Sequence, residues 1–385
     1  MIAALVFLVT LNLRPSLTVV GPLLPHIGDD EGLSEGMLGL LGALPLVAFA
    51  MVSPLVHQLS TRWGADRAML AGLLVLAGGI GLRSYTGSVG LWLGTLVIGS
   101  AIAVGNVLVP AIVKQDYASN VSRATGIYSA CMGVGAAVAS AVAVPLAAAT
   151  DWRGALGFWA LPALVVAVLW LPRARSGASV VEPQPSDGHP PVSVWRQPMA
   201  WLLTAFMGLQ STIFYVMVTW LPTIETSAGL SAGEAGLHLF SYQLVGLLAG
   251  LAIPRLMRRP DNQVVAAVTS SVPVVIAALG LLFVPDLALL WVVVAGFGSG
   301  SSLVLALSLI SLRGRNHQET TQLSGMTQSL GYLFAAAGPV VAGYLGQRTG
   351  SWQATLILIA ALAVAQTAVA IPAGRDRTVH SGVMP

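Results

Sequence analysis

The chain has 385 residues, of which 56% are hydrophobic and 9% are charged, and its formal net charge is +3. Because about a quarter of the residues of an ordinary soluble domain are charged, this composition excludes such a domain and indicates a membrane protein. The small positive charge comes from basic residues that separate apolar segments, so we expect no nucleic-acid partner.

Apolar segments follow one another along the whole chain, and most are long enough to cross about 30 Å of hydrocarbon as a helix. Glycine, proline and charged residues mark the ends of twelve predicted spans. These spans cover residues 3–26, 35–59, 67–86, 89–113, 122–149, 153–172, 197–224, 232–256, 262–283, 287–312, 319–347 and 351–373. The predicted fold class is therefore an all-α polytopic membrane protein with twelve transmembrane helices.

The first predicted span contains an arginine followed directly by a proline, in the stretch NLRPSLTVVGPLLPHI at residues 12–27. A charge near the centre of a span costs free energy, so we expect Arg14 to face a cavity, a partner or a substrate. Pro15 has no N–H and leaves the carbonyl of Leu11 without its helical partner, so the helix should bend beside Arg14. Hydrogen bonds from Arg14 to backbone carbonyls, or an ion pair formed on folding, are the alternative to substrate binding.

An internal repeat divides the chain into two halves. LPHIGDDEGLSEGMLG at residues 24–39 aligns without a gap on LPTIETSAGLSAGEAG at residues 221–236, an offset of 197. Residues 173–196 are rich in Pro, Ser and Gly and predict a cytoplasmic linker. We therefore expect an N-terminal six-helix bundle over 1–172 and a C-terminal six-helix bundle with a short cytoplasmic tail over 197–385.

The two copies must have the same orientation in the membrane, because an even number of spans separates them. Two pseudo-symmetric six-helix bundles related in this way form the major facilitator fold, with the substrate near the midplane between them. The loop RWGADRAM at 62–69 resembles the loop motif of that superfamily in Arg62, Gly64 and Arg67, although Thr61 replaces its usual acidic residue.

The stretch at residues 12–27 resembles the signature of the cyanate and 2-nitroimidazole transporter family within the superfamily. This resemblance implies secondary or facilitated transport of a small anionic or polar compound by alternating access, with Arg14 as the functional residue. A cyanate-, nitrate- or nitroimidazole-like compound fits this expectation. A guanidinium suits the task because it stays protonated and presents a planar fork of donors to an oxyanion or a nitro group.

Polar side chains inside the predicted spans are the further candidates for substrate binding. Helical spacing places Thr18 on the stripe of Arg14 and Asn12 on an adjacent face. The repeat offset maps Arg14 to Ser211 and Thr18 to Tyr215. The remaining polar groups within predicted spans are Asn106, Tyr128, Gln210, Tyr242, Gln243, Gln328 and Tyr332. Hydrogen bonding between helices is the alternative role for each of them.

Three residues are candidates for gating or proton coupling. His238 lies one turn after Glu234 in the eighth span, and His26 lies at the outer end of the first. The sequence contains no zinc-binding helix motif, no nucleotide-binding loop and no nucleophile elbow. We therefore expect no metal, no cofactor and no enzymatic activity.

The basic residues predict how the chain crosses the membrane. Fourteen fall on one side of the twelve spans, three on the other and one within the first span, which places both termini in the cytoplasm by the positive-inside rule. Arg83, Arg153 and Arg348 fall on the outer side, and together with the inner Arg173 they are interpreted as topological anchors. We expect a monomer in the bacterial cytoplasmic membrane.

The alternative function is a multidrug exporter that is coupled to protons and has a broad apolar pocket. Exporters of this kind usually carry a glycine-proline motif in the fifth span, whereas the comparable GPVVAG lies in the predicted eleventh span. A polytopic membrane enzyme would need acid, base or metal ligands clustered at one membrane face, and the sequence shows no such cluster.

Overall fold

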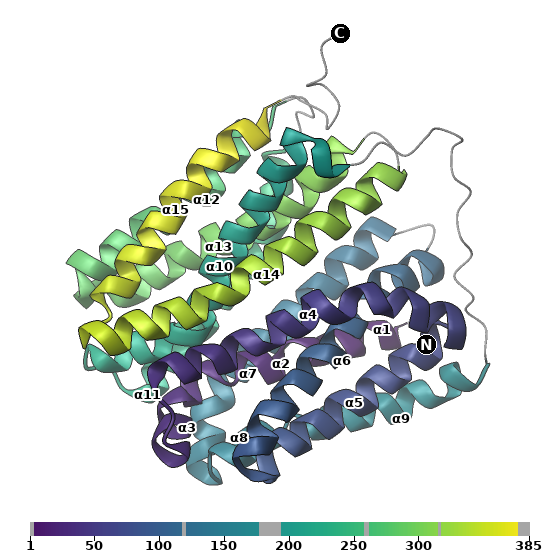
Figure 1. Cartoon of the computed structure of the whole chain (residues 1–385), viewed down its shortest axis with the longest axis horizontal. Coiled ribbons are helices and arrows are strands. Elements are labelled where there is room, and N and C mark those ends of the chain that lie inside the picture. The colour runs from purple at the N-terminus through teal and green to yellow at the C-terminus, as the bar shows by residue number, and fades with distance from the viewer. Residues whose placement is uncertain (1–3, 118–120, 177–193, 258–261, 315–316, 376–385) are drawn as a thin grey trace. The chain divides into compact units, whose positions relative to one another are not determined.

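The computed structural model of the chain describes residues 4–117, 121–176, 194–257, 262–314 and 317–375 (Figure 1). Within these ranges the chain forms helices and no strand. The first elements are α1 (Leu5–Leu13), α2 (Pro15–Thr18), η1 (Gly21–Leu23), α3 (Leu24–Glu31), α4 (Glu35–Trp63), α5 (Ala65–Tyr85), α6 (Gly87–Asp116), α7 (Val121–Ala149), α8 (Trp152–Gly157) and α9 (Ala160–Ser176). The later elements are η2 (Val194–Arg196), α10 (Pro198–Ser227), α11 (Ala232–Ala252), η3 (Ile253–Arg255), α12 (Val264–Phe283), η4 (Pro285–Leu287), α13 (Ala288–Arg313), α14 (His317–Thr349) and α15 (Gln353–Gly374).

The described residues contain twelve helical stretches that are long and apolar enough to cross a membrane. The first consists of four pieces, α1, α2, η1 and α3, and runs from Leu5 to Glu31. The sixth, Trp152–Arg175, combines α8 with most of α9. The prediction of twelve spans is confirmed, because the long charge-free segments of the sequence are the helices of the structure.

The chain forms two compact units. The N-terminal unit comprises Met1–Pro183 with Val218–Phe240, and the C-terminal unit comprises Gln184–Met217 with Ser241–Pro385. The boundary between them falls within α10 and within α11, so each of these helices contributes to both units. The division at a linker over residues 173–196 stays a prediction, and residues 177–193 of that segment lie outside the described residues.

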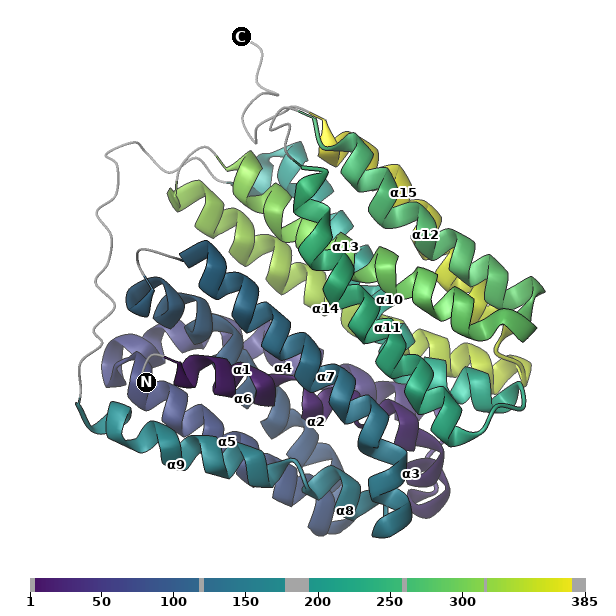
Figure 2. The same cartoon turned by 180° about the vertical axis from the view of Figure 1, so that it is seen from behind.

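Corresponding helices pack in the same pairs within each unit, as the internal repeat requires. In the N-terminal unit α1 packs on α7, α4 on α6, and α5 on both α6 and α9 (Figure 2). In the C-terminal unit α12 packs on both α13 and α15. Glycines bring the backbones together in the other pairs, Gly246 of α11 against Gly300 of α13 and Gly208 of α10 against Gly331 of α14. Small residues allow this close approach because they leave no side chain between the helices.

The repeated tripeptide Gly-Leu-Ser builds the same turn in both halves of the chain. Gly32 has a φ of 63° and Gly229, at the repeat offset of 197, has a φ of 102°, a region that residues with a Cβ rarely adopt. Two residues later, Ser34 and Ser231 each accept a hydrogen bond at the N-terminus of the next helix, at 3.4 and 3.3 Å. The sequence identity at these positions therefore preserves a helix stop followed by a helix start.

Replacing Gly229 with alanine is expected to lower the free energy of unfolding by about 1 kcal/mol, because a Cβ is strained at this backbone conformation. Gly78→Ala is the matched control: Gly78 lies inside α5, and a Cβ there has no atom within 4 Å. Alanine should therefore be neutral or stabilising at position 78. Thermal unfolding of the two variants in detergent micelles measures the difference, and equal midpoints would contradict the assigned turn.

Candidate functional site

The first span is broken beside Arg14, as the sequence predicts. α1 ends at Leu13 and α2 begins at Pro15, and Arg14 between them has a φ of −107°. Because Pro15 has no N–H, the carbonyl of Leu11 loses its helical partner. This carbonyl lies against Gly135 of α7, so closely that a Cβ on Gly135 would overlap it. The predicted bend is thus confirmed as a helix break, and a glycine accommodates it.

The polar residues around the break contact backbone carbonyls. Arg14 is half-buried and has a partner of its own. Asn12 is buried, and its Nδ2 donates to the carbonyl of Leu8 at 2.8 Å. Thr18 is buried, and its Oγ1 lies 3.0 Å from the carbonyl of Ala136 in α7 and 3.3 Å from that of Arg14. Thr18 therefore ties the segment after the break to α7.

Two further predicted residues lie on helices that pack on α1. Asn106 of α6 is half-buried and follows Gly105, on which a Cβ would overlap the side chain of Leu13. Tyr128 of α7 is also half-buried. In the N-terminal unit, α6 and α7 therefore both pack against α1, the helix that ends directly before Arg14.

The predicted residues of the C-terminal unit are largely buried. Gln210 and Ser211 are each 2% exposed, and Gln210 Nε2 donates to Ser211 Oγ at 2.6 Å. The hydroxyl of Tyr242 donates to Ser299 Oγ at 2.8 Å. Gln328 Nε2 donates to a serine hydroxyl one turn earlier in α14, at 2.7 Å. These side chains therefore form hydrogen bonds between helices or within one helix, and bonding between helices is the alternative to substrate binding stated above.

An aromatic cluster joins α10, α11 and α14 within the C-terminal unit. Tyr215 packs edge-on against Phe214, with ring centroids 5.2 Å apart, and edge-on against Tyr332, at 6.4 Å. Phe214 also lies 6.1 Å from the ring of Tyr242. Tyr215 is half-buried. The sequence identified the three tyrosines one by one, but it missed Phe214 and did not group them.

His238 pairs with Glu225 rather than with Glu234. His238 Nδ1 lies 2.7 Å from Glu225 Oε1, across the hairpin of α10 and α11. Glu225 is 2% exposed, and its Oε2 has no hydrogen-bond partner among the described residues. Glu234 is exposed and accepts from the N–H and hydroxyl of Ser231, at 2.9 and 2.7 Å. Glu234 is therefore a helix-capping residue, and the buried carboxylate beside His238 is Glu225.

His26, the third candidate for gating, is exposed near the start of α3. It lies on the helical piece that follows the break and η1 in the first span. The part of the chain that the structure describes holds no group of three or more His, Cys, Asp or Glu side chains that could bind a metal ion.

The loop motif at Arg62, Gly64 and Arg67 joins α4 to α5. Gly64 has a φ of 83°, which explains why glycine suits this turn. Arg62 is exposed, whereas Arg67 Nε donates to the carbonyl of Ala174 in α9, at 3.3 Å. The motif therefore connects α5 with the end of α9 as well as with α4.

A buried arginine lies behind this loop. Arg173 of α9 is 8% exposed, and its Nε lies 2.5 Å from Asp66 Oδ1 in α5. Its Nη1 and Nη2 donate to the two oxygens of Asp116 in α6, at 2.5 and 2.9 Å. The interpretation of Arg173 as a topological anchor at the membrane surface is wrong, because its guanidinium joins three helices. Nothing in the spacing of these residues, 57 and 107 apart, indicates this cluster.

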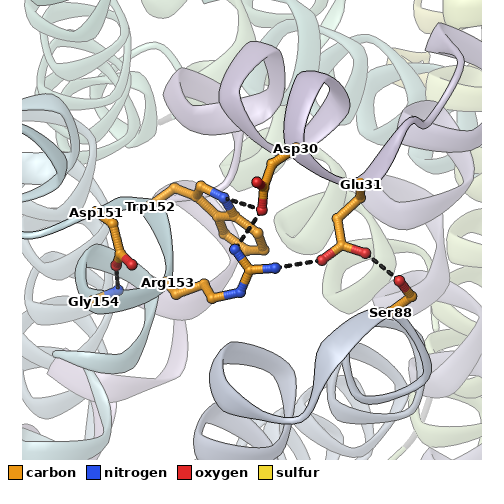
Figure 3. Close-up of polar contacts among 7 residues, drawn as sticks. All are labelled: Asp30, Glu31, Ser88, Asp151, Trp152, Arg153 and Gly154. Atoms are coloured by element: carbon orange, nitrogen blue, oxygen red, sulfur yellow. Dashed lines mark hydrogen bonds and ion pairs between the residues drawn. The ribbon is translucent and has the colours of Figure 1, made fainter.

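A second ionic cluster joins α3, α6 and α8 (Figure 3). Arg153 Nη1 lies 2.5 Å from Asp30 Oδ2, and Nη2 lies 2.7 Å from Glu31 Oε1. Trp152 Nε1 donates to the same Asp30 oxygen at 3.2 Å, and Ser88 Oγ donates to Glu31. The guanidinium also lies 4.1 Å from the centroid of the Trp152 ring. Arg153 thus joins α8 to α3 through two ion pairs, and Glu31 extends the cluster to Ser88 of α6.

Arg83 is buried inside the N-terminal unit. It lies in the last turn of α5, is 2% exposed, and its Nη1 donates to the carbonyl of Ser16 at 2.7 Å. The interpretation of Arg83 as an anchor at the membrane surface is wrong, because the side chain points into the bundle toward the broken first span; its place on the outer side stays a prediction. The sequence missed this contact, since position 83 lies close to a predicted span end.

Known proteins resemble this chain over nearly its whole length. A family profile described as Major Facilitator Superfamily matches residues 6–336. The 2-nitroimidazole transporter of Escherichia coli (strain K12) is 38% identical over 376 residues, 97% of this chain and 95% of that protein. The cyanate transport protein of the same strain is 29% identical over 348 residues, 90% of each chain.

Solved structures show the same fold. The crystal structure of a bacterial homologue of the human lysosomal transporter Spinster, inward-facing and unoccupied, matches with a TM-score of 0.77 at 14% identity, covering 97% of this chain and 96% of that one. The predicted fold class and the family resemblance inferred from residues 12–27 are thereby confirmed.

Arg173→Met is expected to lower the free energy of unfolding by about 3 kcal/mol, because it removes the cation that the buried Asp66 and the half-buried Asp116 share. Arg175→Met is the matched control, since Arg175 is exposed on the same helix, and it should change stability by less than about 0.5 kcal/mol. Chemical or thermal unfolding of the purified variants measures both. Equal stability of the two variants would refute a structural role for the Arg173 cluster.

Proposed function

Because this chain belongs to the major facilitator superfamily, we propose that it is a secondary or facilitated transporter of a small anion or a small planar polar compound. Arg14 binds the substrate, and the protein exposes it to each side of the membrane in turn. The observation that carries this proposal is the interruption of the first span, which places a guanidinium at a helix break within a membrane-spanning segment.

The chemistry of a guanidinium fits the substrates named for the two transporters of Escherichia coli. Cyanate is a small anion, and 2-nitroimidazole carries a planar nitro group beside a ring. A guanidinium donates two parallel N–H bonds to acceptor atoms in one plane and stays charged at any physiological pH. A guanidinium can therefore bind both an anion with a full negative charge and the partly negative oxygens of a nitro group.

The residues around the break support a site of defined shape. Pro15 interrupts the first span beside Arg14, and Gly135 makes room for the carbonyl of Leu11 that the interruption leaves open. Thr18 and Asn12 are held by backbone carbonyls, so they shape the backbone next to Arg14. Asn106 and Tyr128 are half-buried on neighbouring helices and are the further polar groups proposed for the substrate.

The aromatic cluster of the C-terminal unit supports a planar substrate. Tyr215 and Phe214 form a rigid edge-to-face pair, and aromatic rings bind flat, electron-poor heterocycles through their faces and edges. Gln210 and Ser211, one helical turn before, add hydrogen-bonding groups on α10. A nitroheterocycle uses both kinds of group, whereas a small inorganic anion needs the cation alone.

The alternative, an exporter with a broad apolar pocket, is not favoured. Two relatives that cover 90% or more of the chain are named for 2-nitroimidazole and for cyanate, and neither compound is large or lipophilic. A cation in the first span would also repel the lipophilic cations that such exporters carry.

We further propose that the pair of His238 and Glu225 takes up the proton that couples transport to the proton gradient. The carboxylate is buried beside the imidazole, and the exposed Glu234 one turn earlier on α11 is engaged by Ser231. A single proton changes the charge of such a pair, and a buried pair tolerates only a small net charge. If the pair has a structural role alone, we expect the protein to work as a uniporter or an exchanger that is not coupled to protons.

Arg14→Gln is expected to weaken binding of cyanate and of 2-nitroimidazole by about tenfold or more, because it removes a charge-assisted hydrogen bond. Arg14→Lys should retain part of the affinity for cyanate but less for 2-nitroimidazole, since an ammonium lacks the planar fork. Scintillation or thermal-shift binding to the purified protein measures both, with Arg175→Gln at an exposed position as the control. Unchanged anion binding together with binding of lipophilic cations would favour the exporter instead.

His238→Gln and Glu225→Gln are expected to abolish accumulation driven by a pH gradient in proteoliposomes while leaving substrate exchange at equilibrium largely intact. Each variant removes one of the two groups that hold the proton together, so the pair no longer takes up the proton and the gradient no longer drives transport. His26→Gln provides the comparison, because His26 is an exposed histidine outside this pair. Accumulation that persists in the His238 variant and disappears in the His26 variant would assign the coupling to the first span.

A further inference from the structure

Arg83 is a buried cation with few partners. It is 2% exposed, and its Nη1 donates to the carbonyl of Ser16 at 2.7 Å. Its Nε and Nη2 are buried and have no hydrogen-bond partner among the described residues. No carboxylate of the described ranges lies within ion-pair distance of it.

The carbonyl that Arg83 contacts has no partner within its own helix. In a continuous helix the carbonyl of Ser16 accepts from the N–H of Val20. Here α2 ends at Thr18, and the N–H of Val20 donates to the carbonyl of Leu17 instead, at 3.4 Å. The guanidinium of Arg83 takes the place of the missing partner.

Two helices therefore hold the segment that follows Arg14. On one side Arg83 of α5 bonds to the carbonyl of Ser16. On the other side Thr18 bonds to the carbonyl of Ala136 in α7, at 3.0 Å. Ser16 and Thr18 lie two and four residues after Arg14. These two bonds therefore fix the position of the backbone directly after Arg14, whose guanidinium is proposed to bind the substrate.

Burial of a cation with one of its donors paired and no anion nearby is unfavourable for the fold, and an apolar side chain of similar size is often tolerated better at such a position. A single neutral carbonyl is a weak reason for a guanidinium inside a membrane bundle, where ionisable groups are by default functional. The contact therefore points to a role in shaping the break rather than in supporting the bundle.

We propose that Arg83 is a positioning residue for the substrate site: by holding the Ser16 carbonyl, it fixes the break in the first span and thereby the direction of the Arg14 guanidinium. This inference rests on the proposed function. Arg83 acts through the backbone and does not touch the substrate. Its loss therefore lowers the affinity for the substrate but leaves the Arg14 guanidinium in place as the binding group.

The test compares Arg83→Met with Arg83→Lys. Methionine fills a similar space without donors, whereas the ammonium of lysine can reach the same carbonyl. In Arg83→Met the thermal midpoint is expected to stay within about 2 °C of the unmodified protein or to rise, while binding of radiolabelled cyanate and 2-nitroimidazole weakens about tenfold or more. Arg83→Lys should restore most of the affinity, and Thr18→Val should show the same selective loss as Arg83→Met.

Arg348→Met is the matched control, because Arg348 is an exposed arginine near the end of α14, and it should leave both binding and the midpoint unchanged. Unchanged binding in folded Arg83→Met would overturn the inference. So would loss of the folded protein in that variant, since the guanidinium would then support the bundle itself. If Arg14→Gln also leaves binding intact, the proposed function fails; if only Arg83→Met does so, the positioning role alone fails.

Discussion

Hydrocarbon offers no partner to a backbone carbonyl, and a proline cannot supply an N–H to the carbonyl four residues before it. Pro15 therefore imposes a requirement on its neighbours that no local rearrangement meets. The carbonyl of Leu11 lies against a glycine of α7. The short helix α2 then ends at Thr18, and an arginine of α5 donates to the carbonyl of Ser16, which has no helical partner. The segment around Arg14 therefore depends on contacts with α5 and α7.

The strength of the contacts varies along the N-terminal unit. Ion pairs fasten both ends of the sixth span, through Arg153 of α8 and Arg173 of α9. The segment beside Arg14 is held by single hydrogen bonds to neutral carbonyls. Such bonds can be exchanged without separating opposite charges, and their net contribution is smaller than that of a buried ion pair.

The two copies of the repeat share their framework but differ in their chemistry. The turn at Gly32 recurs at Gly229, with the same backbone requirement. The position of Arg14 is occupied by Ser211 in the second copy, and that of Thr18 by Tyr215. One unit therefore offers a cation beside a helix break, and the other offers an aromatic cluster with a buried amide and hydroxyl.

The sequence by itself determined the features that depend on neighbouring residues. Hydropathy set the twelve spans, the repeat set the equivalent turns, and Pro15 set the break beside Arg14, because membrane insertion, glycine conformation and the missing N–H of proline act locally. Only the tertiary structure decided which charged groups are buried and paired. Arg83, Arg173 and Glu225 lie near predicted span ends, where a long side chain can reach lipid headgroups or fold back into the bundle. Their partners are up to 107 residues away along the chain. The local sequence therefore does not predict whether such a side chain extends toward the headgroups or turns into the bundle.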